Sequence, residues 1–470
     1  MTGALDGSPV ALGTARGRWL VTVTVLASGM AFLDATAVSV ALPSIGRQFG
    51  SSLSGLQWTV TGYTLTLAAL ILLGGSLGDR YGRRRVFVIG VVWFSVASLV
   101  CGLAQDTGQL VAARALQGVG GALLTPGSLA LIQSSFRPED RARAIGLWSA
   151  LAGISGLVGP FLGGFLVDAV SWRLVFLVNV PLAVLIVVVA GRHVPESRAG
   201  GQHGRFDSVG AALGALALGG ITYALIGAGE NMLRADVLIS GAIGLIAGAA
   251  FVVRERRATD PMLPPRLFTD RQFTGANLAT LAVYGALGGS GLFLVLQLQN
   301  VLGYDATASG AAMLPTILLI TLLSPRAGAL AQRIGPRLPM TVGPLIVAAG
   351  TLLLAGVDGS APYVVEILPG SVLQGLGMAL VVAPLTATVL GAAPDALAGI
   401  ASGVNNAVAR AAQLLAVAAL PVAVGLSGDD YEDPAAFTSG FRMAMLVCAG
   451  LFAAGGVISW ATIRNDVLKA

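Results

Sequence analysis

Charge is scarce in this chain of 470 residues, because only 11% of them are Asp, Glu, Lys or Arg, against about 25% in an ordinary soluble domain. Hydrophobic residues make up 55% and recur in long runs with few internal charges. A soluble core is built instead from short amphipathic stripes. The composition therefore excludes a soluble globular protein and indicates an integral membrane protein.

Cysteine and histidine are nearly absent too, with two of each. Cys101 and Cys448 lie in apolar runs, where a thiol packs as a small hydrophobic group, so they indicate nothing about redox state. His193 and His203 share one polar loop without a third ligand, and we interpret them as solvated. We therefore expect neither a metal nor a cofactor. The one lysine, Lys469, beside abundant Ala, Gly and Arg suggests GC-rich bacterial coding.

The chain has many apolar runs that are long enough to span a membrane. A span needs about 20 helical residues, because every backbone amide must be satisfied within the hydrocarbon layer. The first run is retained in this interpretation, since it is too long for a signal-peptide core. Fourteen runs qualify, and they cover residues 19–43, 57–77, 86–104, 109–132, 144–168, 174–192, 208–228, 236–254, 273–298, 307–324, 338–356, 362–390, 400–425 and 441–463.

Arginine placement predicts the orientation of these helices, because basic residues in short loops stay on the cytoplasmic side. With the N-terminus inside, 22 basic residues fall in cytoplasmic segments, two within helices, and four on the other side, namely Arg47, Arg173, Arg234 and Arg442. We therefore expect a multi-pass protein of the cell membrane with both termini in the cytoplasm. Topology also explains the net charge of +5 without a nucleic-acid partner.

An internal repeat relates the two halves of the chain. The segment "GSLGDRYGRR" at 75–84 aligns with "GALAQRIGPR" at 328–337, each after the second helix of a six-helix block. The first copy, extended by Arg85, resembles the loop signature of the major facilitator superfamily. The second departs from it, because Gln332 replaces Asp79. In that family the loop is thought to latch the outward-open state, which the resemblance assigns here to Gly75, Gly78, Asp79, Arg80, Gly82, Arg83 and Arg84. Positive-inside topology alone would explain the arginines but not the glycines and Asp79.

Three further stretches resemble motifs of the fourteen-helix drug:proton antiporters within that superfamily. They are "FLDATAVSVALPSI" at 32–45, "RALQGVGGALLTP" at 114–126 and "GISGLVGPFLGG" at 153–164. The last is typical of exporters. It places small residues on seams that allow close helix approach, and the proline favours a bend. The residues of this antiporter helix are Gly153, Gly156, Gly159, Pro160, Gly163 and Gly164.

The resemblance implies an all-α major facilitator fold with fourteen transmembrane helices in a 6+2+6 order. We divide the chain at its polar linkers. The segments are a cytoplasmic tail at 1–18, an N-terminal six-helix bundle at 19–192, a linker region with two extra helices at 193–254, a C-terminal bundle at 255–463, and a tail at 464–470.

Asp34 and Arg114 lie within predicted helices, at similar depths. A membrane-embedded Asp costs about 2.5 to 3.5 kcal/mol on insertion scales and is usually functional. Removal of water favours the protonated carboxyl group and a nearby arginine favours the ionised one, so a local rearrangement can bind and release a proton. We interpret the two residues as a proton-coupling site. A static buried ion pair is the alternative that the sequence leaves open.

Polar residues at membrane depth generally face a cavity or a partner. Four of them cluster in the run from 400 to 425, and the other three lie in other apolar runs. The predicted substrate-cavity residues are Gln117, Asn179, Gln297, Asn405, Asn406, Arg410 and Gln413.

We expect a proton-coupled exporter of lipophilic small molecules such as drugs, antibiotics or quaternary ammonium compounds, working in membrane lipid as a monomer. A symporter or facilitator is the alternative within transport, and the exporter-type segment at 153–164 argues against it. An integral-membrane lipid-modifying enzyme would need a loop rich in catalytic His, Asp or Ser, which no loop here offers. The charge of the cargo stays open.

The predicted topology is tested by reporter fusions at residues 200 and 430. Alkaline phosphatase should be inactive at 200, because this position follows an even number of spans and is cytoplasmic. It should be active at 430, because that position follows an odd number of spans and is outside. Activity on the same side at both positions would contradict the fourteen-helix order.

Overall fold

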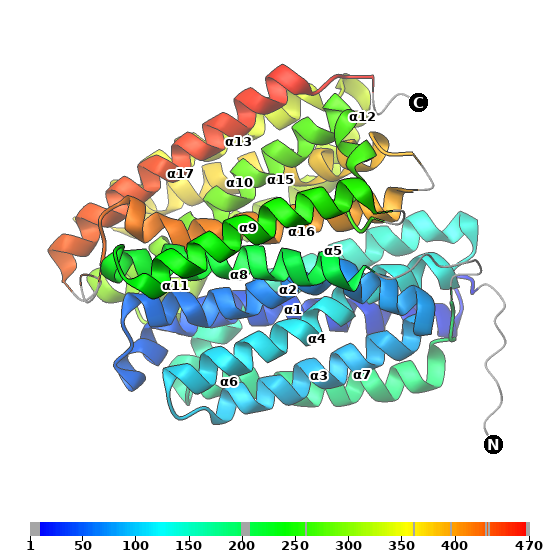
Figure 1. The fold of residues 1–470 in the computed structure, drawn as a ribbon, viewed down its shortest axis with the longest axis horizontal. Helices are drawn as coiled ribbons and strands as arrows, with labels where there is room; N and C mark the ends of the chain where they lie inside the picture. The colour runs from blue at the N-terminus through cyan, green and yellow to red at the C-terminus, as the bar shows by residue number, and fades with distance from the viewer. Residues whose placement is uncertain are drawn as a thin grey trace.

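The computed structural model describes residues 10–198, 207–258, 261–360, 362–394, 397–427, 430 and 433–466, and these residues are helical apart from turns, loops and one isolated bridge between Val10 and Phe136. The long helices lie side by side along one axis of the molecule (Figure 1). Thirteen helices within the described ranges are long and apolar enough to cross a membrane. The remaining expected span, 144–168, lies in α5, of which Ile154–Ala169 is a shorter apolar stretch.

The first half forms one packed group in which α4 lies against both α2 and α3, and α1 lies against α5. The short α6 and the longer α7 follow each other directly within one apolar span. The helices are α1 (Ala15–Phe49), α2 (Leu53–Tyr81), α3 (Arg83–Leu103), α4 (Thr107–Ser135), α5 (Pro138–Ala169), α6 (Arg173–Leu177) and α7 (Asn179–His193).

The second half forms a second group in which α15 packs on α12 and α13, and α10 packs on α16 and α17. Its elements are η1 (Pro265–Thr269), α10 (Arg271–Leu296), η2 (Gln297–Val301), α11 (Ala306–Ala312), α12 (Leu314–Ile334), α13 (Arg337–Leu354), α14 (Tyr363–Glu366), α15 (Leu368–Gly391), α16 (Ala398–Ala423) and α17 (Pro434–Thr462).

Side-chain caps explain where several of the helices begin. Thr14, Ser52, Asp106 and Asp207 have extended or otherwise non-helical backbones, and each side chain accepts a hydrogen bond from a backbone N–H of the first turn. These N–H groups have no partner within the helix, so a capping oxygen stabilises the helix start by about 1 kcal/mol.

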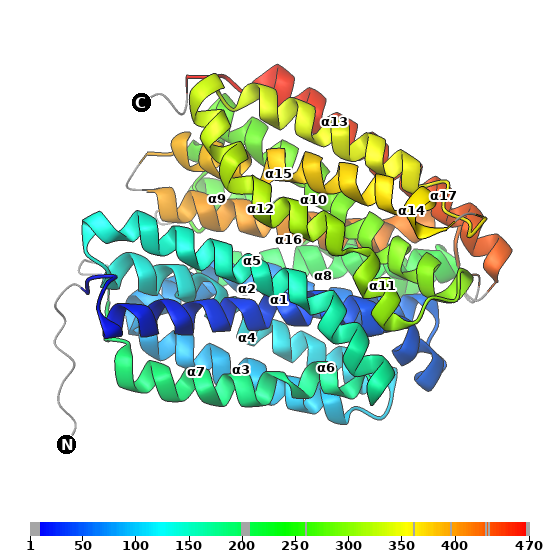
Figure 2. The ribbon, with the colours of Figure 1, turned by 180° about the vertical axis from the view of Figure 1, so that it is seen from behind.

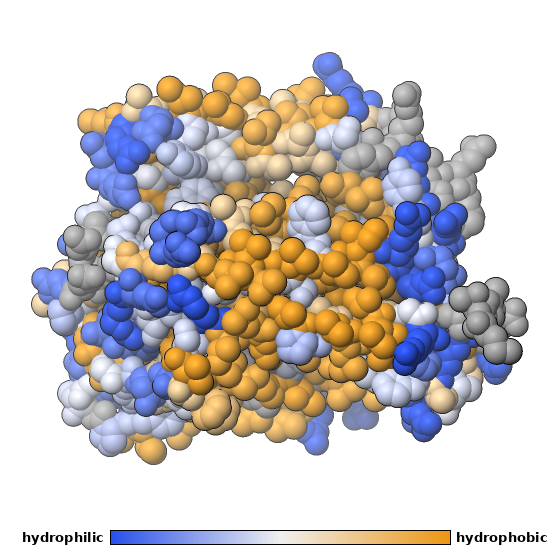
Figure 3. Space-filling model, turned by 90° about the horizontal axis from the view of Figure 1, so that it is seen from below, coloured by the Kyte–Doolittle hydropathy of each residue, from blue (hydrophilic) through white to orange (hydrophobic). Residues whose placement is uncertain are grey.

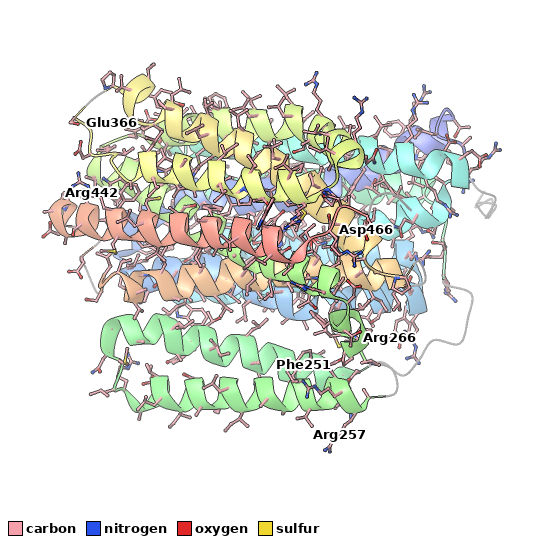
Figure 4. The ribbon with its side chains drawn as sticks, turned by 90° about the horizontal axis from the view of Figure 1, so that it is seen from above. Phe251, Arg257, Arg266, Glu366, Arg442 and Asp466 are labelled. Atoms are coloured by element: carbon pink, nitrogen blue, oxygen red, sulfur yellow. The ribbon has the colours of Figure 1, made fainter. Side chains whose placement is uncertain are left out.

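Two extra helices, α8 (Ser208–Asn231) and α9 (Ala235–Arg257), form a hairpin that contacts α2 and α16. Figure 4 shows this pair along one side of the bundle. One end is fixed by an ion pair of 3.2 Å between Arg254 Nη2 and Asp207 Oδ1. Burial opposes ionisation of Asp207, but hydrogen bonds from the Gly210 N–H and from Arg254 outweigh it, so its pKa lies below the ordinary value.

The outer surface matches a membrane environment. Figure 3 shows a predominantly apolar middle zone between two hydrophilic ends. Large aliphatic side chains stand outward on α9, where Leu245 and Ile246 are 68% and 69% exposed. Such a surface is stable in hydrocarbon and unstable in water.

One end of the molecule collects the arginines and is called the arginine-rich end below. It holds the start of α1, the α2–α3 turn and the end of α9, and their basic residues are Arg16, Arg18, Arg80, Arg83, Arg84, Arg85, Arg254, Arg256 and Arg257. The start of α1 and the end of α17 lie at this same end (Figure 1). The opposite end is called the far end; Glu366 and Arg442 lie there (Figure 4).

The two halves touch at the far end, where α5 packs on α11 and α12 (Figure 2). A Cβ atom added at Gly164 would clash with the carbonyl group of Ala306, and one added at Gly310 would clash with the carbonyl group of Pro160. Asp168 strengthens this contact, since its carboxylate accepts hydrogen bonds from the Thr307 N–H at 2.7 Å and hydroxyl at 2.6 Å.

The glycines of α5 serve two different neighbours. Gly159 and Gly163 face α1, where an added Cβ would meet Thr36 and, at 2.6 Å, Ala37. Gly164 faces α11 in the other half. Gly156 has open space around it, and Gly153 lies outside the residues whose surroundings are described.

The α5–α11 contact yields a prediction about the far end. Gly164→Val should prevent its closure, because the added carbons need the space of the Ala306 carbonyl. A Ser309→Cys reporter, buried in α11, should then react with a thiol reagent several-fold faster in the purified protein. Cys101 and Cys448 are buried and give little background.

Gly156→Val, on the same helix but in open space, is the matched control and should leave the labelling rate unchanged. Equal labelling of the reporter in the Gly164→Val and parent proteins would show that α5 and α11 do not close the far end.

Candidate functional site

A buried ion pair joins α1 and α4 inside the N-terminal group. Arg114 Nη1 lies 2.5 Å from Asp34 Oδ2, and the two side chains are 2% and 0% exposed. The sequence placed both residues at membrane depth, and the structure brings them together. A pair so completely removed from water needs further partners, because desolvation costs several kcal/mol per ion.

Two amides complete the surroundings of the carboxylate. Gln117 Nε2 donates to Asp34 Oδ1 at 2.7 Å, and Asn179 Nδ2 donates to the same oxygen at 3.2 Å. Gln117 Oε1 in turn accepts from Arg114 at 2.8 Å. Asn179 also donates to Ser98 on α3 at 3.0 Å. The Asp34 carboxylate of α1 thus accepts three hydrogen bonds from α4 and α7, and Asn179 links it to α3.

The guanidinium of Arg114 has partners that do not depend on Asp34. Its Nε donates to the Thr59 carbonyl at 3.2 Å, and its Cζ lies 4.4 Å from the centre of the Tyr63 ring. A cation over an aromatic face is stabilised by the ring quadrupole. Protonation of Asp34 would remove the counter-charge while leaving Arg114 these contacts and Gln117. Arg114 therefore has three contacts besides Asp34.

A cavity of about 1350 Å³ lies beside this cluster, between the two halves. Tyr63, whose ring covers Arg114, belongs to its wall, as do Ala31 and Phe32, within one turn of Asp34. The cavity reaches the surface at the arginine-rich end, where the exposed Arg256 and Arg266 line it. Figure 4 shows Arg266 at that end, where the α8–α9 pair meets the bundle. The far end is covered by the α5–α11 contact.

One helix of the C-terminal half contributes a row of polar residues to the cavity wall. Ser402, Asn406 and Arg410 follow each other at intervals of four residues on α16, so they lie on one face, and all three line the cavity. Asn406 donates to the Ser402 carbonyl at 3.1 Å. Of the seven residues predicted for the substrate cavity, Asn406 and Arg410 are therefore at its wall.

The other five predicted cavity residues have protein partners away from the wall. Gln117 and Asn179 bind Asp34 as described. Gln297 in the π-helical turn η2 donates to the Val357 carbonyl at 3.1 Å. Asn405 donates to Thr280 at 2.7 Å, and Gln413 packs on Gly288, so both connect α16 with α10. Sequence alone could not separate these faces, because all are polar groups at similar depths.

The arginine-rich turn between α2 and α3 lies at the mouth of the cavity. Asp79 Oδ1 accepts from Arg83 Nε at 2.8 Å and lies 2.7 Å from its Nη2. Gly82 has φ of +113°, a conformation that favours glycine, and an added Cβ would meet Glu196 at 2.7 Å. Gly75 and Gly78 have only ordinary contacts, and Arg80 lies over the ring of Tyr81.

Sequence reasoning missed two contributors to this mouth. Glu196 accepts from the backbone N–H groups of Arg84 and Arg85, at 3.1 and 3.2 Å, and so caps the start of α3. Arg84 Nη1 donates to the Val194 carbonyl at 3.0 Å. The segment around Pro261–Arg266, just after α9, also lines the cavity. Its prolines were the one available signal, since they mark a loop that cannot continue the helix.

Within the described ranges, no group of three or more His, Cys, Asp or Glu side chains is placed to hold a metal ion.

Comparison with known proteins gives this architecture a family. A family model described as "Major Facilitator Superfamily" matches residues 24–207 and 203–417. The multidrug resistance protein Stp of Mycobacterium tuberculosis is 38% identical over 394 residues, which cover 82% of this chain and 72% of that protein. The puromycin resistance protein pur8 of Streptomyces alboniger is 35% identical over 462 residues, covering 95% and 92%.

Solved structures show the same fold at low identity. A bacterial homologue of the lysosomal transporter Spinster, in an inward-facing unoccupied conformation, superposes with a TM-score of 0.67 at 16% identity, covering 96% of this chain and 97% of that one. A mutant of the peptide transporter POT gives 0.67 at 17% identity, covering 97% and 98%. The all-helical fold, the internal repeat and these matches together establish that this chain is a membrane transporter and belongs to the major facilitator superfamily.

Proposed function

We propose that this protein exports lipophilic small molecules across a bacterial cell membrane in exchange for protons, as a monomer. The observation that carries the proposal is the sealed Asp34–Arg114 pair beside a cavity that the two halves share. The names of its relatives support export: one is a tetracenomycin C resistance and export protein of Streptomyces glaucescens, 34% identical over 425 residues.

The orientation follows from the positive-inside rule. The arginine-rich end then faces the cytoplasm, so the cavity is open to the inside and the α5–α11 contact closes the outside. Cargo enters from the cytoplasm or the inner leaflet. Alternating access moves the opening to the far end, with α8 and α9 as extra spans in a fourteen-helix, 6+2+6 arrangement.

The contacts of the cluster support proton exchange. In the outward-open state Asp34 takes up a proton, and Arg114 keeps the Thr59 carbonyl, the Gln117 oxygen and the Tyr63 ring. In the inward-open state the carboxyl group loses the proton toward the cavity and recovers the ion pair seen here. Tyr63 lies between the buried ion pair and the cavity, since its ring contacts Arg114 and it also lines the cavity.

The turn at 75–84 acts in this proposal as the latch of the outward-open state. Among the described residues, Asp79 is paired within its own turn, to Arg83. Leu397 and Ile400, at the start of α16, line the same cavity. When the cytoplasmic end closes, the Asp79 carboxylate can approach the positive N-terminal end of α16.

The latch predicts that Asp79→Asn lowers transport several-fold without loss of membrane insertion, because the amide carries no charge for the helix end. Labelling of the Ser309→Cys reporter in membranes should fall, since fewer molecules occupy the outward-open state. Asp466→Asn, an exposed acid paired with Arg464 at the same end, is the control. If Asp79→Asn showed unchanged labelling of the reporter and full transport, the turn would have only a topological role.

The coupling site predicts that Asp34→Asn separates binding from energised export. Asn keeps the shape and hydrogen-bonding capacity but cannot release a proton. A proton gains about 2.3 kcal/mol per 100 mV on entry, and the variant cannot use that gradient. Substrate-driven proton movement in proteoliposomes should fall at least tenfold, while cargo binding and exchange persist.

The matched control is Asp106→Asn, which makes the same chemical change at the N-cap of α4, where asparagine also caps well. Its proton movement should equal that of the parent protein. Parent-level proton movement and cargo accumulation in Asp34→Asn would make the Asp34–Arg114 pair purely structural.

A further inference from the structure

Arg410 differs from the other membrane-embedded charges of this protein. Asp34 and Arg114 neutralise each other. Arg410 lines the cavity, and it forms no hydrogen bond or ion pair with any residue that the structure describes. It lies twelve residues into α16, roughly 18 Å from the start of that helix at 1.5 Å per residue. An unpaired guanidinium at such depth is costly and indicates a functional role.

The surroundings of Arg410 suit an apolar body with one polar end. Tyr63 of the other half lines the same cavity and offers an aromatic ring with a hydroxyl group. Asn406, one turn away on the same face of α16, adds a neutral polar group. Other wall residues near this depth are the apolar Phe32 and Ile71 and the neutral Thr125.

The acids of the cavity wall do not offset Arg410. Asp79 is paired with Arg83 and Asp207 with Arg254. Glu255 lies near the end of α9, at the mouth, where Arg256 and Arg266 also line the cavity. The deep part of the cavity therefore carries one positive charge and no accessible carboxylate, because Asp34 is sealed behind three donors.

From this placement we propose that Arg410 is the recognition residue for an anionic oxygen group on the cargo, a carboxylate, phenolate or enolate attached to an apolar ring body. The inference rests on the export function proposed above and names its substrate class. A guanidinium presents a planar set of donors that matches such an oxygen group, and the hydrogen bonds are strengthened by the opposite charges. Permanently cationic lipophilic compounds should bind poorly at this depth.

The proposal is tested by binding to the purified full-length protein with three probes that share one apolar body. They are 1-pyrenebutyrate, 1-pyrenebutanol and (4-(1-pyrenyl)butyl)trimethylammonium, which are anionic, neutral and cationic. The parent protein should bind the anion at least tenfold more tightly than the cation. Arg410→Gln should weaken binding of the anion by about tenfold or more, the effect of losing a charge-assisted hydrogen bond, and leave the neutral probe within threefold.

Two further variants keep the result interpretable. Arg410→Lys retains the charge and should recover part of the affinity for the anion. Arg266→Gln removes an arginine at the exposed mouth of the same cavity and should change anion binding less than threefold. Thermal unfolding of each variant controls for folding.

Three results would overturn the proposal: equal losses for all three probes in Arg410→Gln, unchanged binding of the anion in that variant, or an equal loss in Arg266→Gln. Equal losses for all three probes would indicate that Arg410 has a structural role. An equal loss in Arg266→Gln would indicate that the anion responds to the overall positive charge of the cavity. Export is measured separately with the same probes in proteoliposomes. Charge-selective binding without transport would contradict the export function but support the recognition role of Arg410. Transport without charge selectivity would support the export function but contradict that recognition role.

Discussion

The burial of two opposite charges is the constraint on which the N-terminal half depends. Each ion loses several kcal/mol of hydration, and their attraction compensates only if the remaining donors and acceptors are also satisfied. Asp34 therefore holds α4 and α7 through Arg114, Gln117 and Asn179. Arg114 reaches α2 through the Thr59 carbonyl and the Tyr63 ring. The packing of these helices and the chemistry of the pair cannot be altered separately.

The two halves carry different kinds of membrane-embedded charge. The N-terminal half buries the Asp34–Arg114 ion pair, and the C-terminal half presents Arg410 of α16, which has no partner among the described residues, to the cavity. If the cargo is an anion, its outward movement and the inward movement of a proton shift charge in the same direction. A membrane potential that is negative inside then favours both steps, by about 2.3 kcal/mol per charge per 100 mV.

Closure of the far end depends on backbone proximity more than on charge. Gly164 and Gly310 let α5 and α11 approach until each faces a carbonyl group of the other helix. Small residues are the usual means of association between helices in lipid, where hydrophobic burial gives no driving force. The same helix turns Gly163 toward Ala37 of α1. Helix α5 therefore contacts both the other half and the helix that carries Asp34.

The sequence by itself determined the membrane character, the helical fold, the family and the depth of Asp34 and Arg114, because hydrophobic length and rare embedded charges are local properties of a segment. Only the tertiary structure decided which polar groups share a face. It moved Gln117 and Asn179 from the expected cavity to the carboxylate, assigned Asn405 to α10, and left Arg410 at the wall without a partner among the described residues. The physical reason is that helix rotation and tilt are fixed by packing between distant segments, which the hydropathy of each segment does not encode.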